Sequence, residues 1–126
     1  MATPISAELA TRWIEDGTAE KILDSRRAEA FARLKLAHHS ISATPGYHHI
    51  WLTLPEPWRA TAYTEEAKRQ GIVIAPAEIF VAGRSNAPHA VRICIGMPRQ
   101  RKKLDYALDV LAEILLSLNM RDIAMV

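Results

Sequence analysis

The sequence is poor in cysteine, glycine and aromatic residues, and each shortage limits what the chain can be. Among 126 residues there is one cysteine, Cys94, so no internal disulfide can form and a reducing compartment fits best. There are only five glycines, with no glycine-rich loop of the kind that cradles phosphates, and aromatic residues make up 6%. Apolar residues still reach 49% and charged residues 24%, the balance of one folded domain with its own core.

The sequence also lacks a long hydrophobic run and a strong charge of one sign. No apolar stretch approaches the roughly 20 residues that a membrane-crossing helix needs, and residues 1–10 lack the basic-then-apolar pattern of a signal peptide. The formal net charge is +2, so the totals do not call for a nucleic acid or a membrane surface as partner. We therefore expect a soluble, cytoplasmic chain.

Recognised catalytic and metal-binding patterns are missing as well. There is no Gly-x-Ser-x-Gly, and no nucleophile is grouped with a base and an orienting residue. Adjacent histidines on a helix or strand point in different directions, and the pairs His38–His39 and His48–His49 have no Cys or acidic cluster at ligand spacing. We expect no metal site and no catalytic residues in this chain.

Periodicity and punctuation predict an α+β order of elements. Regularly spaced leucines mark the last helix, and β-forming runs that end before Pro55 and Pro98 mark strands. The predicted helices cover residues 6–16, 18–41, 59–70 and 100–119; the predicted strands cover 50–54, 72–74 and 91–95, with a further extended piece at 78–81 and a loop at 42–47. This order implies a small, mainly antiparallel sheet with helices packed on one face.

The first part of the chain is predicted to be helical throughout. We expect a single domain over residues 1–126, with a helical lead-in over 1–41 and an α/β sandwich core over 42–126. The second predicted helix would span roughly 36 Å at about 1.5 Å per residue. It carries an apolar seam, with Arg33 and Lys35 on the opposite side. Such a helix either bridges two bodies, as an interdomain helix does, or runs over the surface of the sheet.

Arg92 is the most informative single residue. It lies in the predicted strand 91–95, where alternation puts Val91, Ile93 and Ile95 on one face and Arg92 and Cys94 on the other. A guanidinium fixed on a rigid strand among apolar neighbours offers donors that match a carboxylate in a bidentate way. The sequence predicts either an anion receptor at Arg92 or a surface arginine on the solvent side of a half-exposed sheet.

Residues near Arg92 have an ordinary interpretation beside a functional one. His89 could line the same pocket as Arg92 or be a solvated loop residue. Cys94 is expected to be a small buried filler, since no helix start lies nearby to activate its thiolate. A short basic run could contact phosphate, but it is brief and lacks interleaved aromatics, which favours a solvated helix start. That run consists of Arg99, Arg101, Lys102 and Lys103.

Several segments, taken in order, resemble one known family. They are Trp13–Ala19 (WIEDGTA), Gly46–Leu52 (GYHHIWL), Leu54–Arg59 (LPEPWR), Gly71–Pro76 (GIVIAP) followed by Phe80, and Ala87–Gly96 (APHAVRICIG). Each is short, but their order and spacing together resemble the C-terminal part of MocR-type regulators of the GntR superfamily. These regulators join a winged helix-turn-helix to a fold-type-I aminotransferase-like domain. The resemblance covers nearly the whole chain and corresponds to the small, C-terminal aminotransferase domain.

The resemblance implies a role for Arg92. In fold-type-I aminotransferases the matching strand presents the arginine that grips the substrate α-carboxylate, so Arg92 would bind an amino-acid-like effector or substrate. The long helix would join the large and small domains. The helix-free face of the sheet would then look toward the cofactor cleft of a domain that this chain does not contain.

The resemblance also implies what this chain lacks. Enzymes of this type hold pyridoxal phosphate on a lysine of the large domain. The lysines of this chain all fall on predicted helices and outside the family's lysine motifs: Lys21, Lys35, Lys68, Lys102 and Lys103. We therefore expect no cofactor in this chain, and pyridoxal phosphate in the presumed full-length parent.

Three functions follow as expectations. The first is the small domain of a regulator, whose partners would be the missing large domain, a second copy in a homodimer, a carboxylate ligand, and DNA through an absent N-terminal domain. The second is the small domain of a genuine class I/II aminotransferase. The third is a stand-alone interaction module, with the open sheet face covered by a partner.

Overall fold

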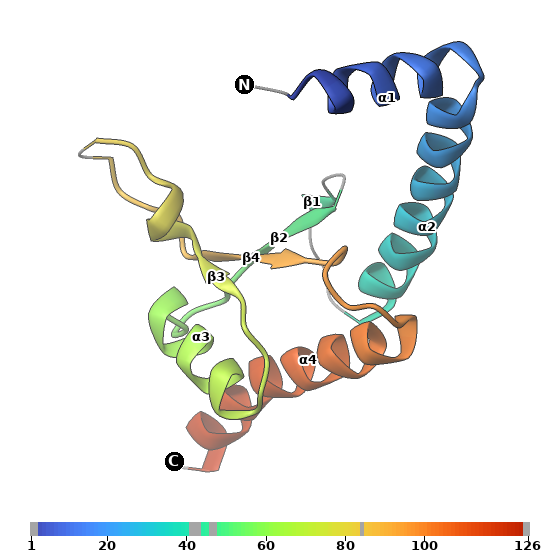
Figure 1. The fold of residues 1–126 in the computed structure, drawn as a ribbon. Coiled ribbons are helices and arrows are strands. Elements are labelled where there is room, and N and C mark those ends of the chain that lie inside the picture. Colours follow the sequence, from blue (N-terminus) through green and yellow to red (C-terminus); the bar gives the residue numbers. More distant parts are fainter. Residues whose placement is uncertain (1–2, 41–43, 46–47, 84, 125–126) are drawn as a thin grey trace. The chain divides into compact units, whose positions relative to one another are not determined.

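The computed structural model describes residues 3–40, 44–45, 48–83 and 85–124 (Figure 1). The elements in chain order are α1 (Pro4–Glu15), α2 (Thr18–Ser40), β1 (Thr44–Pro45), β2 (His49–Thr53), α3 (Ala60–Arg69), β3 (Ala75–Pro76), the 3-10 turn η1 (Ala77–Phe80), β4 (Ala90–Cys94) and α4 (Arg101–Ala124). The chain divides into two compact units, residues 1–32 and 33–126. The predicted boundary between a lead-in and a core at residue 41 stays a prediction.

The start of α1 and the break after it follow from local chemistry. The Thr3 hydroxyl oxygen accepts the Ser6 N–H at 3.3 Å, and Pro4 opens the helix, where its missing N–H has no cost. Gly17 has φ +77°, a conformation that favours glycine and lets the chain restart as α2. The Asp16 side chain accepts the Thr18 N–H at 2.9 Å, and hydrogen bonding by the side chain and then the backbone of Thr18 lowers the pKa of Asp16.

Helix α1 buries none of its residues. The predicted apolar stripe is present, yet Ile5, Leu9 and Trp13 are 81%, 45% and 42% exposed. A 12-residue helix with an uncovered apolar stripe gains little from tertiary packing within this chain.

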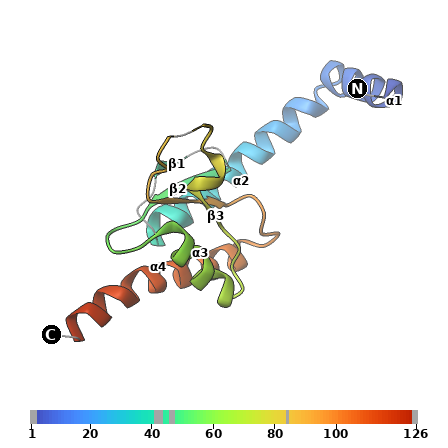
Figure 2. The ribbon, with the colours of Figure 1, turned by 90° about the vertical axis from the view of Figure 1, so that its left-hand side faces the viewer.

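The second unit is built on a four-stranded antiparallel sheet in the order β1-β2-β4-β3. Its centre is the β2–β4 ladder, in which Ile50 pairs with Ile93 and Leu52 pairs with Val91. These four side chains are buried on one face, which also receives the buried sides of α3 and α4 and residues near the end of α2. Figure 2 shows α3 and α4 on the same side of the strands. The predicted α+β class, with helices on one sheet face, is confirmed.

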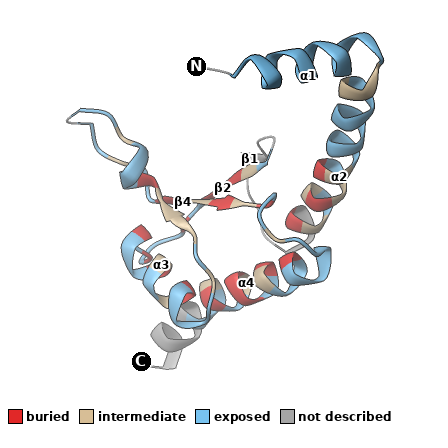
Figure 3. Ribbon diagram, in the orientation of Figure 1, coloured by how far each residue is buried: buried red, intermediate tan, exposed pale blue. Residues whose placement is uncertain are grey.

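The core extends from this sheet face into the helices (Figure 3). Helix α4 buries residues at three- and four-residue spacing, namely Leu104, Leu108, Leu111 and Ile114. Helix α3 buries Ala60, Tyr63 and Ala67. The Tyr63 hydroxyl donates to the Leu111 carbonyl at 2.8 Å, so the one polar group on this side of α3 is satisfied inside the core.

Three predicted segments are wrong in detail. Residues 72–74 form no strand: the Ile72 N–H donates to the Ala67 carbonyl at 2.9 Å and closes the end of α3, so pairing with β4 starts only at β3. The piece expected to be extended at 78–81 is instead η1. The predicted loop 42–47 contains β1, a strand that pairs with β2. It is only two residues long, which is too short for the side-chain alternation that marks a strand in a sequence.

The prediction for Arg33 is also wrong. Expected on the polar side of α2, Arg33 is only 8% exposed. Its Nη1 donates to the carbonyls of Ile95 and Pro98, the first at 2.9 Å, just beyond the end of β4. Arginine can bury its stem and satisfy its charged end with backbone acceptors, which helix periodicity does not reveal.

Among the described helices there is no candidate for a membrane-spanning segment, because none combines the required length with sufficient apolar character.

Candidate functional site

Arg92 lies at the centre of the sheet, on the face opposite the one that packs against α3, α4 and the end of α2. Along β4 the side chains of Val91 and Ile93 are buried, whereas those of Arg92 and Cys94 are half-buried. This is the alternation predicted from the sequence. Strand β4 is paired on both sides around Arg92, with Trp51 of β2 on one side and Ala75 of β3 on the other. The backbone beneath Arg92 is therefore fixed by two ladders.

The hydrogen-bond pattern brings Trp51 and Arg92 close together. The Ile95 N–H donates to the His48 carbonyl at 2.9 Å, and the Leu54 N–H donates to the His89 carbonyl at 2.8 Å. Hydrogen-bonded and non-hydrogen-bonded pairs alternate along an antiparallel ladder, so the Trp51–Arg92 pair is of the non-hydrogen-bonded kind. In such pairs the side chains approach most closely.

Phe80 completes the site from the 3-10 turn. The Arg92 Cζ lies 4.0 Å from the centroid of the Phe80 ring, within the range of a cation–π interaction. The rings of Trp51 and Phe80 meet edge to face, with centroids 5.5 Å apart and an interplanar angle of 83°. Two aromatic rings and one guanidinium thus form a cluster, which we call the arginine–aromatic cluster (Trp51, Phe80 and Arg92).

The guanidinium of this cluster keeps its hydrogen-bonding capacity. Within the described ranges no carboxylate, carbonyl or hydroxyl accepts a hydrogen bond from Arg92. A planar group with five N–H donors, in contact with a ring through its central carbon, can still receive an anion through the donors that point away from the ring. The chemistry that suits it is bidentate recognition of a carboxylate or phosphate.

The other candidate residues do not join the cluster. His89 is exposed, and its Nε2 lies 2.9 Å from Nη1 of Arg59 at the start of α3. Cys94 is a free, half-buried cysteine paired in register with His49. The side chains of His38 and His39 lie outside the described residues. No three His, Cys, Asp or Glu side chains gather as metal ligands among those that the structure describes.

The residues present do not fit pyridoxal phosphate. The cofactor needs a lysine for its aldehyde and a cup of donors for its phosphate. The lysines of this chain are all exposed and all lie on helices: Lys21 and Lys35 on α2, Lys68 on α3, and Lys102 and Lys103 on α4. None of the described strands of the sheet therefore offers the cofactor a lysine.

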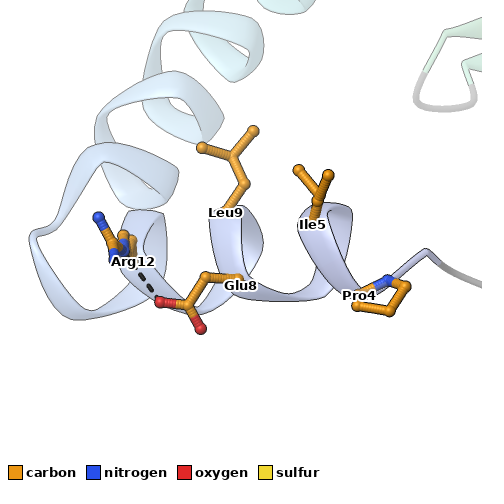
Figure 4. Close-up of a pocket in the computed structure, with 5 residues that line it drawn as sticks. All are labelled: Pro4, Ile5, Glu8, Leu9 and Arg12. Carbon is orange, nitrogen blue, oxygen red and sulfur yellow. Dashed lines mark hydrogen bonds and ion pairs between the residues drawn. The ribbon is translucent and has the colours of Figure 1, made fainter.

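A hollow on α1 is unrelated to the cluster. It is lined by Pro4, Ile5, Glu8, Leu9 and Arg12, and the Arg12 Nε donates to Glu8 Oε1 at 3.0 Å (Figure 4). All five residues lie on one helix, so the hollow is a surface depression that cannot enclose a ligand.

Comparison with solved structures defines the class of fold. The chain superposes on kynurenine aminotransferase of Pyrococcus horikoshii with a TM-score of 0.69 and 22% identity, covering 84% of this chain and 28% of that one. It superposes on LysN, the α-aminoadipate aminotransferase of Thermus thermophilus, with a TM-score of 0.72 and 18% identity, covering 94% of this chain and 30% of that one. The described fold is that of a segment of the aminotransferases.

Sequence comparison narrows this class. No family model matches the chain. The chain is 29% identical to an uncharacterized HTH-type transcriptional regulator of Bacillus subtilis (strain 168), YdeF, over 90% of this chain and 26% of that protein. Together with the aminotransferase fold, this confirms the resemblance to an aminotransferase-like domain of a MocR-type regulator. The chain spans about a quarter of the length of that relative.

Sequence reasoning finds Arg92 but misses its neighbours. The sequence indicates Trp51 only as a large anchor, and Phe80 only as part of a family segment. Alternation along β2 could have placed Trp51 on the outer face, but its pairing with Arg92 depends on the register. Phe80 could not be placed, because the sequence predicts an extended segment where the structure has η1.

Proposed function

We propose that this chain is the small domain of an aminotransferase-like transcriptional regulator, and that it supplies Arg92 as the carboxylate receptor for an amino-acid-like effector. The observation that carries the proposal is the position of Arg92: on a doubly paired strand, on the face opposite the core, with its donors free of partners among the described residues. A receptor of this kind needs a second body to complete the site. The 26% coverage of the regulator relative leaves room for that body in a longer parent.

The proposal assigns the remaining parts of the site to that parent. A large domain would hold pyridoxal phosphate, and a separate helix-turn-helix domain would bind DNA. In the proposal a second copy forms a homodimer with the first, and the parent works in the cytoplasm. The chain alone would not catalyse a reaction, because its own residues supply only the carboxylate-binding side of a site.

A second candidate is the small domain of a genuine aminotransferase. The aminotransferase fold of the chain favours it, while the likeness to a helix-turn-helix regulator favours the first candidate. The parent gene would decide between them, since a winged helix-turn-helix region belongs to the regulator alone. A stand-alone interaction module is the third candidate. It requires the open sheet face to be covered by a self-associating surface or another protein, which size measurement of the purified chain would reveal.

The test of the carboxylate receptor is an Arg92→Ala substitution in a longer protein that contains this segment. Removing a guanidinium from a bound carboxylate should weaken effector or substrate binding by about 2–4 kcal/mol, because the carboxylate loses charge-assisted hydrogen bonds. Arg99→Ala is the matched control, since Arg99 is an exposed arginine beyond the end of β4. Unchanged binding in Arg92→Ala, or an equal loss in both variants, would refute the assignment.

A second measurement tests the assignment of the cofactor to another domain. The 126-residue chain is titrated with pyridoxal phosphate and passed through gel filtration. We expect no retained cofactor absorbance, because all five lysines are exposed on helices and none lies on the strands that carry the cluster. Stoichiometric retention would mean that one of these lysines forms a true cofactor site, and the division of labour proposed above would be wrong.

A further inference from the structure

We infer that Phe80 is a positioning residue, which acts through Arg92: its ring holds the guanidinium in the orientation that receives a carboxylate edge-on. The inference rests on the proposed function, because it names what makes Arg92 ready to bind. It concerns the arginine–aromatic cluster and assigns a role to a side chain outside the sheet.

The path of the chain brings Phe80 to Arg92. Strand β3 pairs beside Arg92, and η1 follows it directly, with Ala77 only 2% exposed as its buried anchor. Three residues later the ring of Phe80 lies 4.0 Å from the Arg92 Cζ. The short connection leaves few ways to move the ring without breaking the pairing of β3.

Trp51 also packs against the ring of Phe80. It is the in-register neighbour of Arg92 on β2 and meets Phe80 edge to face at 5.5 Å. On the opposite side of Arg92 the in-register neighbour is Ala75, which is too small to reach over the guanidinium. The contacts that restrict Arg92 among these neighbours are thus aromatic, from Phe80 directly and from Trp51 through Phe80.

Confinement of this kind changes how Arg92 binds an anion. A free arginine loses rotamer entropy when it is fixed by a ligand, and that cost weakens binding. An aromatic ring in contact with the guanidinium restricts the side chain beforehand, while the N–H donors that point away from the ring remain available for a bidentate carboxylate. Phe80 therefore raises the affinity of Arg92 without touching the ligand.

The experiment uses the 126-residue chain labelled with nitrogen-15 and carbon-13, and follows the Nε–Hε signal of Arg92 by NMR. The variants are Phe80→Leu, which keeps an apolar side chain without a ring, and Phe80→Tyr, which keeps the ring. Ile79→Ala is the matched control, since Ile79 is the 65% exposed neighbour on the same turn. The probe is acetate at constant ionic strength, with neutral acetamide as its isosteric control.

We expect the Arg92 Hε signal of the original chain and of Phe80→Tyr to be shifted by the ring and its Nε to be rigid on the nanosecond timescale. Phe80→Leu should lose both signatures and bind acetate about two- to fivefold more weakly, the size expected for an exposed cation–π contact. Ile79→Ala should change neither. Recovery in the tyrosine variant separates a role of the ring from a general loss of structure.

Two results would overturn the inference in different ways. If acetate shifts Arg92 equally in the original chain and in Phe80→Leu, Phe80 has no positioning role and the carboxylate receptor still stands. If acetate and acetamide are equivalent at Arg92 in every variant, the receptor itself fails and the role of Phe80 falls with it.

Discussion

The two faces of the β2–β4 ladder share one backbone but differ in how deeply their side chains are buried and in what packs against them. On the inner face Ile50, Leu52, Val91 and Ile93 are at most 5% exposed and contact α3, α4 and the end of α2. On the outer face His49, Trp51, Arg92 and Cys94 are half-buried, and the Phe80 ring at the end of a 3-10 turn packs against Trp51 and Arg92. The difference teaches that alternate residues of the same strands can serve different ends: one set builds the core, while the other set, with Arg92, is left out of it.

The largest expected effect contrasts neighbours on β4 that point to opposite faces. Ile93→Ala should destabilise the fold by about 2–5 kcal/mol, because it leaves a cavity between the sheet and α4. Cys94→Ala, one residue further on the outer face, should cost less than about 1 kcal/mol. Urea denaturation followed by circular dichroism measures both. Equal losses would mean that the outer face is as tightly packed as the inner one.

Arg33 tests whether a charged group can belong to the inner side. Arg33→Met keeps an unbranched apolar stem but removes the guanidinium, so the carbonyls of Ile95 and Pro98 are left without this donor. We expect a loss of about 1–3 kcal/mol in the free energy of unfolding. Lys35→Met, on an exposed position of the same helix, is the control and should change it by no more than about 0.5 kcal/mol. A stabilised Arg33→Met would show that the buried charge costs more than its hydrogen bonds return.

Tyr63 tests the packing of the inner side through the pH dependence of the free energy of unfolding. Tyr63→Phe removes the hydroxyl that donates to Leu111 and should cost about 0.5–1.5 kcal/mol. Burial raises the pKa of the Tyr63 phenol above its usual value near 10. Above that value the unfolded phenol ionises while the folded one stays protonated, so stability should fall by about 1.4 kcal/mol per pH unit. Denaturation at pH 8 and pH 11 should show a shallower decline in the phenylalanine variant; an identical decline would contradict this account.

The smallest expected effect belongs to Arg92 itself. Arg92→Gln should change stability by no more than about 1 kcal/mol, the value of an exposed cation–π contact, because the residue supports no part of the core. Thermal unfolding would measure it beside Ile93→Ala. A loss comparable to that of Ile93→Ala would make Arg92 a structural residue and would remove the main support for the proposed receptor.

The elements that could be predicted from the sequence are those with a strong periodic signal. Helices α2 and α3 begin and end within one residue of their predicted bounds, and the alternation on β4 placed Arg92 on the open face. The misplaced parts have no side-chain periodicity: β1 and β3 contain two residues each and exist through backbone pairing. The same holds for the site. Arg92 could be predicted because it is a charged residue between β-branched residues of a strand. The contact of Phe80 with Arg92 could not, because it depends on the conformation of the 3-10 turn that carries Phe80.

The register of the central ladder has a consequence for how this site could evolve. An insertion or deletion of one residue in β4 would turn Arg92 into the hydrophobic interior and bring a core side chain out, so the arginine can migrate along the strand only in steps of two. One such step leads to Ala90, which is only 5% exposed and is paired with Thr53 instead of Trp51. The other leads to Cys94, paired with His49 instead of Trp51. In related sequences the arginine can therefore be replaced or kept at this position, but an arginine at another position of the strand would lose its in-register pairing with Trp51.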